Sequence, residues 1–244
     1  MDSSLEIRRE LRESEFNSIL GEKLSSRALL YDLGFATDYQ KVWDFQKKLA
    51  EQRILGSIPD TIVMVEHDHV LTSGRSAHSE NVLVKNLPHY EIERGGDVTY
   101  HGPGQLVVYP IVSLQRRSLG IREYIEALEE VIIAALGTLG ISECTGKFGP
   151  LTGVWVSNTR KIASIGVAVS HWVTYHGLAL NVNTDLSYFQ KIKPCGFESS
   201  IMTSVAKELK VVDVDMRNVK ELVLDGFSRK FGFVFESATL PFDL

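Results

Sequence analysis

Apolar residues recur along the chain with a helical spacing in some stretches and as short runs or alternations in others. Between residues 38 and 53 they stand three, four and seven positions apart, as on one face of an amphipathic helix. The same spacing covers residues 121–139, the longest such stretch, and Gly140 follows as a natural stop. Further helical patterns lie around residues 199–209 and 217–231. These four stretches are the predicted helices.

Short apolar runs between polar turns predict strands. The predicted strands cover residues 28–33, 61–66, 90–93 and 105–112, followed by a β-meander at 153–156, 161–169 and 173–182. A chain of 244 residues with both kinds of element is long enough for one large α/β domain or two small ones.

The composition is that of a soluble globular enzyme, with 44% hydrophobic and 23% charged residues. A net charge of −5 argues against general binding of nucleic acid, which favours a basic surface. No apolar run approaches the roughly 20 residues that span a bilayer, so no membrane association is expected. The two cysteines are too few for a disulfide scaffold and form no C-x-x-C pair, which favours a reducing, cytoplasmic setting.

The first 26 residues differ from the rest because charged residues dominate them. We interpret residues 1–26 as an N-terminal extension without chemistry. No internal repeat or low-complexity linker interrupts residues 27–244. These residues are expected to form a single catalytic domain, with room for a smaller C-terminal lobe.

A glycine-rich stretch between Arg94 and Gln105 is the most unusual part of the sequence. It holds four glycines and a proline within a dozen residues, directly before an apolar run. Glycine lets the backbone turn sharply or lie against a ligand. The stretch is either a wall that a ligand approaches closely, with Tyr100 and His101 among its hydrogen-bonding residues, or a glycine-rich hairpin with an incidental histidine.

Cys195 stands between Pro194 and Gly196, with Lys191 and Lys193 just before it. A thiol reacts as its thiolate, and nearby cations lower its pKa. Cys195 is therefore a candidate nucleophile, although a lone cysteine is more often a small hydrophobe. The neighbours of Cys144 offer no such activation.

Lys161 and His176 allow two interpretations each. On a strand, Lys161 would share a face with Ala163 and Ile165, and loss of solvation would lower its pKa toward the range of a useful acid or base. Alternatively, Lys161 is a solvated lysine that ends the turn Asn-Thr-Arg-Lys, which begins at Asn158. His176 begins a run of small residues that allows close approach of the backbone, but it could equally be a core histidine with its hydrogen bonds satisfied.

His67 and His69 resemble half of a metal site, because two residues that stand two apart on a strand point the same way. No other cluster supplies the remaining ligands at a recognisable spacing. We therefore expect no metal here.

Four blocks of sequence, in order, resemble the lipoyl(octanoyl) transferases of lipoate biosynthesis. They are Arg-Gly-Gly-Asp-Val-Thr-Tyr-His-Gly-Pro-Gly-Gln from Arg94, Lys-Ile-Ala-Ser-Ile-Gly from Lys161, His-Gly-Leu-Ala-Leu-Asn-Val-Asn from His176, and Pro-Cys-Gly from Pro194. The resemblance spans roughly residues 28–233. Lys193 departs from the amide or small residue that this family often has before Pro-Cys-Gly.

The resemblance implies an α/β (α+β) fold, a mixed β-sheet flanked by helices, as in lipoate and biotin protein ligases. It implies that Cys195 is the nucleophile that carries the acyl group as a thioester, and that Lys161 lowers the thiol pKa and acts as acid and base. The reaction would move an octanoyl or lipoyl group from acyl carrier protein to a lysine of a lipoyl domain, with no cofactor. The alternatives are an ATP-dependent lipoate protein ligase of the same fold and a non-catalytic acyl-binding protein.

Under this interpretation, the acyl chain needs a dry slot. The residues expected to bind substrate are Arg94, Gly95, Gly96, Asp97, Val98, Thr99, Tyr100, His101, Ser164, Ile165, Gly166, Gly177, Leu178 and Ala179. The residues expected to form a basic landing site for an acidic carrier protein are Arg116, Arg117, Arg122, Lys191 and Lys193. The acceptors would be lipoyl domains of 2-oxoacid dehydrogenase complexes or the glycine cleavage H protein, and the enzyme is expected to be a monomer.

Overall fold

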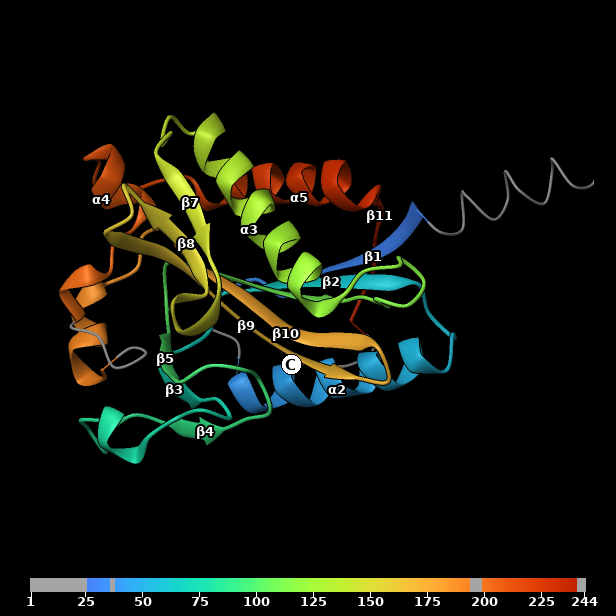
Figure 1. Ribbon diagram of the computed structural model, residues 1–244, viewed down its shortest axis with the longest axis horizontal. Coiled ribbons are helices and arrows are strands. Elements are labelled where there is room, and N and C mark those ends of the chain that lie inside the picture. The colour runs from blue at the N-terminus through green and yellow to red at the C-terminus, as the bar shows by residue number, and fades with distance from the viewer. Residues whose placement is uncertain (1–25, 36–37, 194–198, 241–244) are drawn as a thin grey trace, which may run out of the picture.

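The computed structural model describes residues 26–35, 38–193 and 199–240. An eight-stranded mixed sheet forms its centre (Figure 1). In spatial order the strands are β11 (Val234–Ser237), β1 (Arg27–Asp32), β2 (Asp60–Val65), β6 (Gln105–Ile111), β10 (Val173–Asn181), β9 (Arg160–Ser170), β8 (Gly153–Val156) and β7 (Cys144–Lys147).

The strands of this sheet run parallel at one edge and antiparallel elsewhere. Strand β1 pairs in parallel with β2 and β11, and each pair from β2 onward to β7 is antiparallel. The expected meander of β8, β9 and β10 is confirmed, as is the expected mixed sheet. The two outermost strands, β7 and β11, were not predicted.

Helices cover both faces of the sheet. Helices α3 (Ile121–Thr138) and α5 (Met216–Phe231) pack together on one face, whereas α2 (Tyr39–Ile54) lies on the other, as Figure 1 shows. Helix α2 begins where the sequence predicts, because the side chain of Asp38 accepts hydrogen bonds from two amides of its first turn. An apolar core therefore lies on each face of the sheet, between the sheet and the helices that cover it.

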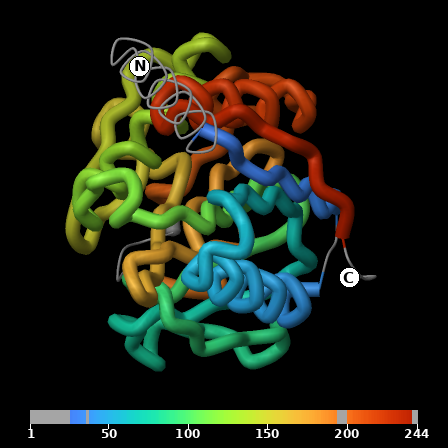
Figure 2. Tube along the Cα trace, turned by 90° about the vertical axis from the view of Figure 1, so that its right-hand side faces the viewer, coloured from blue at the N-terminus to red at the C-terminus, as the bar shows by residue number. Residues whose placement is uncertain are grey.

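A second, three-stranded sheet lies beside α2, below it in Figure 2. Its order is β4 (His89–Glu91), β3 (Val70–Ser73) and β5 (Val98–His101). Val70 and Ile92 of this part pack on Tyr39 of α2. The glycine-rich stretch thus joins the two sheets, since it runs from the small sheet through β5 into β6 of the large one.

The tail pattern at 199–209 does not form one helix. A 3₁₀ turn, η5 (Ser199–Ile201), is followed by extended residues and then by the short helix α4 (Val205–Leu209). The amide of Thr203 donates to the carbonyl of Lys161, and Ser204 caps α4 by accepting from Lys207. Pairing with β9 therefore overrides the helical pattern. Elsewhere in the described part of the chain, 3₁₀ turns lie at η1 (Ser79–Asn81), η2 (Gly149–Leu151) and η3 (Leu186–Lys191).

A buried carboxylate ties α2, β2 and the loop before α3 together. Asp60 accepts from Arg53 at 2.7 Å, from Arg117 at 2.6 Å and from the amide of Ser113 at 3.0 Å. The guanidinium of Arg117 also donates to the carbonyl of Phe231. The expectation that Arg117 belongs to a basic landing site is therefore wrong, because its side chain is largely buried and bonds Asp60 and Phe231.

Among the described residues, no helix is long and apolar enough to cross a bilayer. The predicted extension falls almost wholly within residues 1–25, which lie outside the described residues.

Candidate functional site

A cavity of about 680 Å³ lies where the small sheet meets β9 and β10 of the large one. The amide of Gly95 donates to the carbonyl of Val167 at 2.9 Å, so the glycine-rich stretch docks directly on β9. Of the residues expected to bind substrate, those that line the cavity are Arg94, Gly95, Gly96, Asp97, Val98, Thr99, His101, Ser164, Ile165, Gly166, Gly177, Leu178 and Ala179.

The glycines make this close docking possible. A Cβ on Gly166 would stand 2.9 Å from the carbonyl oxygen of Gly95 and 3.1 Å from the Cδ atom of Arg94. A Cβ on Gly177 would stand 2.2 Å from the carbonyl oxygen of Val108. The atoms that an added Cβ would meet belong to the protein. The small size of these glycines therefore lets the neighbouring segments pack closely against the strands of the cavity wall.

Arg94 braces the wall from inside. It is buried, and its Nη2 atom donates to the carbonyl of Thr72 at 2.7 Å and to the hydroxyl of the same residue at 3.0 Å. Its Nη1 atom donates to the carbonyl of Gly95 at 3.0 Å. The guanidinium of Arg94 therefore holds the start of the glycine-rich stretch against β3, and it also lines the cavity.

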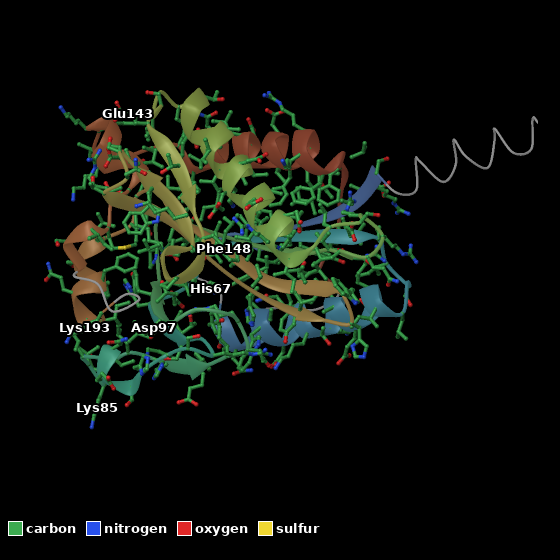
Figure 3. All side chains as sticks on the ribbon, in the orientation of Figure 1. His67, Lys85, Asp97, Glu143, Phe148 and Lys193 are labelled. Atoms are coloured by element: carbon green, nitrogen blue, oxygen red, sulfur yellow. The ribbon has the colours of Figure 1, made fainter. Side chains whose placement is uncertain are left out.

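Asp97 organises the neighbouring loop. Its carboxylate accepts from the side-chain amide of Asn81 at 2.6 Å and from the backbone amides of His78 and Val98. The carbonyl of Asn81 in turn accepts from the amide of Lys193 at 2.8 Å. Figure 3 shows Asp97 and Lys193 at the same end of the molecule.

Strand alternation separates Tyr100 of β5 from its neighbours Thr99 and His101. Thr99 and His101 line the cavity, whereas Tyr100 points to the opposite side and is fully buried. There the hydroxyl of Tyr100 bonds the Nδ1 atom of His69 at 2.8 Å, and its ring stacks on Tyr188. Tyr100 therefore packs in the core of the small sheet, and the structure does not bring it to the cavity.

Lys161 lies near the start of β9 and is 5% exposed. It lines the cavity, and its Nζ atom is 5.7 Å from the centre of the Trp155 ring. A Cβ on Gly153 would stand 2.9 Å from its Cε atom. Of the two interpretations of Lys161, the structure agrees with the lysine in an apolar setting and not with the solvated turn.

A buried carboxylate close to Lys161 was missed at the sequence level. Glu129 of α3 is 5% exposed and accepts from the amide of Gly153 at 3.3 Å. Burial raises the pKa of its carboxyl group, while the positive charge of Lys161 acts in the opposite direction. The signal was present in the sequence, because Glu129 stands four residues after Ile125 and so falls on the apolar face of the helix.

One end of the cavity is polar and aromatic. Tyr39, His101, Tyr109 and His176 line it, and the hydroxyl of Tyr109 bonds the Nε2 atom of His67 at 2.8 Å. Burial lowers the pKa of His101 to about 3, and burial also lowers the pKa of His176. Both imidazoles are therefore neutral at neutral pH.

His176 is not a fully satisfied core histidine. Its backbone has a φ of 57°, in the left-handed region that a non-glycine residue rarely adopts inside a strand. Its Nε2 atom lies 3.4 Å from the carboxylate of Glu93, whose pKa is lowered to about 2, chiefly by this hydrogen bond. Its Nδ1 atom is buried and has no hydrogen-bond partner among the described residues.

His67 and His69 do not form half of a metal site. They bond different tyrosines, His67 bonding Tyr109 and His69 bonding Tyr100. Within residues 26–35, 38–193 and 199–240, no three His, Cys, Asp or Glu side chains gather as metal ligands would.

Cys195, the expected nucleophile, lies outside the described residues. Of the described residues on either side of it in sequence, Lys193 is bonded to Asn81, and Asn81 and Ile201 line the cavity. Cys144 lies on β7, donates to the carbonyl of Ile141, and does not line the cavity. Burial raises the pKa of its thiol, which makes it a poor nucleophile.

Comparison with known proteins finds relatives over most of the chain. The family model described as the lipoyl protein ligase A/B catalytic domain matches residues 38–228. The octanoyltransferase of Syntrophobacter fumaroxidans is 42% identical over 222 residues, which cover 88% of this chain and 95% of that protein. The octanoyltransferase of Solibacter usitatus is 43% identical over 211 residues, which cover 84% of this chain and 91% of that protein.

Solved structures share the fold at low identity. Lipoate-protein ligase A bound with ATP superposes with a TM-score of 0.66 and 18% identity, over 88% of this chain and 90% of that chain. A bipartite lipoate protein ligase from Thermoplasma acidophilum superposes with a TM-score of 0.62 and 19% identity, over 88% of each chain. At this identity the likeness establishes the fold, and the expected mixed sheet of lipoate protein ligases is confirmed.

Proposed function

Since the chain belongs to the lipoyl protein ligase A/B catalytic domain family, we propose that it is an octanoyltransferase of protein lipoylation. The observation that carries this proposal is the identity of 42–43% with octanoyltransferases over nearly their whole length. The ATP-dependent ligases are similar in fold only, at less than 20% identity. The donor would be an octanoyl thioester of acyl carrier protein, and the acceptor a lysine of a lipoyl domain.

The first step of the proposed reaction is thioester exchange. The thiolate of Cys195 attacks the carbonyl carbon of the donor and forms a new C–S bond. The C–S bond to the carrier breaks, and the carrier sulfur leaves with its electron pair as a thiolate. Both sides of the exchange are thioesters of similar energy, so no ATP is needed. Lys161 would favour the thiolate through its positive charge and then give a proton to the departing thiolate.

The second step forms a more stable product. The amine of the acceptor lysine attacks the Cys195 thioester, the C–N bond forms, and the cysteine leaves as thiolate. Lys161, neutral after the first step, would take the proton that the attacking amine loses. Burial at 5% exposure supports this role, because loss of solvation disfavours the charged ammonium, whereas the contact with Trp155 and the carboxylate of Glu129 favour it.

The cavity would bind the acyl chain. Ser164, Ile165 and Gly166 of β9 form one side of it, with Leu178 and Ala179 of β10 beside them. At about 0.8 kcal/mol per buried CH₂, an octanoyl tail would contribute about 5 kcal/mol to binding. The length of the cavity would then distinguish chains that differ by one or two carbons, and only modestly.

The carrier protein would dock on exposed basic residues near the cavity. Arg116, Arg122, Lys191 and Lys193 remain candidates after Arg117 is removed, since none of these four is buried. Ile121, next to Arg122, lines the cavity, and Lys193 is bonded to Asn81 of its wall. An acidic carrier would thus meet positive charge on two sides of the entrance. We further propose that the enzyme acts as a monomer in the cytoplasm.

The proposed function is tested by mixing the protein with octanoyl-carrier protein and a lipoyl domain and following the acceptor by intact mass. We expect octanoylation of the acceptor at the same rate with and without ATP and Mg²⁺. A reaction that uses free octanoate or lipoate and stops without ATP would instead establish the ligase alternative. Retained binding of octanoate without modification of any acceptor would establish an acyl-binding protein.

A Lys161→Met variant tests the role of the lysine. The variant keeps an apolar stem of similar length but has no proton to give or take. We expect transfer to fall by 100-fold or more, the usual contribution of a positioned acid or base. Transfer within threefold of the wild type would remove Lys161 from the mechanism.

A further inference from the structure

The polar end of the cavity has no function in binding an unsubstituted octanoyl chain. An apolar slot would be closed by aliphatic side chains, yet Tyr39, His101, Tyr109 and His176 stand here. Buried polar groups normally have hydrogen-bond partners, so each exception calls for an explanation. Within the described part of the chain, the buried Nδ1 atom of His176 is such an exception.

A chain of buried amides fixes which nitrogen of His101 carries its proton. The carbonyl of Thr203 accepts from the side-chain amide of Asn181 at 3.0 Å, so the oxygen of that amide faces Gln105. The amide nitrogen of Gln105 donates to this oxygen at 2.9 Å, which leaves the Gln105 oxygen to accept from the Nδ1 atom of His101 at 2.7 Å. His101 is neutral, so its Nε2 atom is a bare acceptor.

The same reasoning applies to His176. The carboxylate of Glu93 already accepts from the indole of Trp43 at 3.1 Å, and it faces the Nε2 atom of His176 at 3.4 Å. A carboxylate can only accept, so the proton of the neutral imidazole is on Nε2 and the Nδ1 atom is an acceptor. The left-handed backbone at His176 carries a strain that a purely structural residue does not need, and such strain clusters at functional sites.

Two neutral acceptors and one tyrosine hydroxyl complement a hydrogen-bond donor. The rings of Tyr39 and His101 lie nearly parallel, at 12°, with their centres 6.2 Å apart. A hydroxyl placed at this end could donate to His101 and accept from Tyr39. Resting on the proposed octanoyl transfer, we propose that this end of the cavity is a subsite for an O–H or S–H group on the last carbons of the acyl chain.

The distances along the sheet fit this assignment. Lys161 and Gly166 are five residues apart on β9, about 17 Å at the usual rise of a strand. Gly166 pairs with Gly177, and the next pair along is Val167 with His176. An extended eight-carbon chain covers roughly 9 Å of this distance. An acyl group whose thioester lies on the Gly166 side of Lys161 therefore points its last carbons toward the polar end.

The test compares two donors of equal length, 8-hydroxyoctanoyl- and nonanoyl-carrier protein, which differ by a hydroxyl in place of a methyl. In an apolar slot the hydroxyl would lower kcat/KM about 10-fold to 100-fold, because it would be buried without a partner. We expect instead that the wild-type protein uses 8-hydroxyoctanoyl at least as well as nonanoyl. A ratio of kcat/KM below one tenth would overturn the proposal.

Tyr39→Phe removes one partner of the hydroxyl and keeps the ring. We expect the ratio for the two donors to fall about fivefold, the effect of one hydrogen bond. Tyr90→Phe is the matched control, since its ring lies 5.2 Å from that of Tyr39 but does not line the cavity, and it should leave the ratio unchanged. An unchanged ratio in Tyr39→Phe would overturn the assignment of Tyr39. Because each ratio is taken on one preparation, partial misfolding does not affect it.

Binding of the free acids separates this proposal from the proposed function. 8-Hydroxyoctanoate and nonanoate can be titrated by calorimetry, without any transfer. Tighter or equal binding of the hydroxy acid would support the subsite even if octanoyl transfer itself were absent. Binding of the hydroxy acid more than 10-fold weaker than that of nonanoate would contradict the subsite even if octanoyl transfer were present.

Discussion

Asn81 donates a hydrogen bond of 2.6 Å to the carboxylate of Asp97, across the two segments that flank one side of the cavity. Through this bond the glycine-rich stretch positions the loop of His78 and Asn81, and the carbonyl of Asn81 then holds the amide of Lys193. Lys193 stands two residues before the proposed nucleophile in the sequence. The carboxylate of Asp97 therefore positions Lys193 relative to the cavity, through Asn81.

We predict that Asp97→Ala lowers kcat for octanoyl transfer at least tenfold, because three hydrogen bonds to the carboxylate are lost and the loop is no longer fixed. Steady-state kinetics measures this, and urea unfolding should show a stability loss of about 1–3 kcal/mol. Glu91→Ala, at an exposed carboxylate of the same small sheet, is the control and should change neither quantity appreciably. A wild-type kcat in Asp97→Ala would contradict the positioning role.

Gly177→Ala should destabilise the protein by more than about 2 kcal/mol, or prevent folding, because the new methyl would overlap the backbone of β6. Gly137→Ala is the matched control, since a Cβ there meets nothing within 4 Å and Gly137 lies inside α3. That change should stabilise the protein by up to about 1 kcal/mol. Thermal unfolding of both variants measures the contrast, and equal midpoints would disprove the close approach.

Asp60→Asn should cost about 3–5 kcal/mol of stability, because it leaves the buried guanidinium of Arg53 without its counter-ion. Denaturant unfolding measures this loss. The exposed pair of Arg229 and Asp225 provides the comparison, and Asp225→Asn should cost less than about 1 kcal/mol. A small effect at Asp60 would show that the three-way contact with Arg53 and Arg117 does not stabilise the fold.

Acid should destabilise the protein from about pH 6.5 downward. The pKa of His101 is lowered from 6.5 to about 3 by burial, so between these values the unfolded chain binds a proton that the folded chain does not. The contribution of His101 to stability is therefore complete above pH 6.5 and is lost as the pH falls toward 3, at about 1.4 kcal/mol per pH unit.

Urea unfolding at several pH values between 7.5 and 4.5 measures this slope. His101→Gln should reduce the slope, whereas His171→Gln, at an exposed histidine, should leave it unchanged. A slope that survives in His101→Gln would assign the acid sensitivity to other groups. The lowered pKa of His176 acts in the same direction and would account for part of any remainder.

Most of the architecture could be predicted from local patterns. The apolar periodicity of α2 and α3 and the alternation of the β8–β10 meander are each strong over many residues, and each was predicted within a residue or two of its bounds. The edge strands β7 and β11 were not, because their half-exposed residues carry no apolar alternation and only the pairing partners make them strands.

The sequence predicted which residues line the cavity better than it predicted how they are arranged. Alternation along β5 places His101 in the cavity and Tyr100 behind it, but a strand must first be recognised within the glycine-rich stretch before this follows. The left-handed backbone of His176 is an irregularity within β10, and the adjacent Gly177 indicates an irregularity there without telling which residue adopts it. The burial of Lys161 likewise depends on Trp155 and Gly153 of the neighbouring strand.

The central claim is that Cys195 carries the acyl group, and the mass of the intact protein tests it most directly. After the protein is mixed with octanoyl-carrier protein in the absence of acceptor, we predict one added octanoyl group on the wild type and on Cys144→Ser, and none on Cys195→Ser. An octanoyl adduct of full strength on Cys195→Ser, or its loss in Cys144→Ser, would contradict the account.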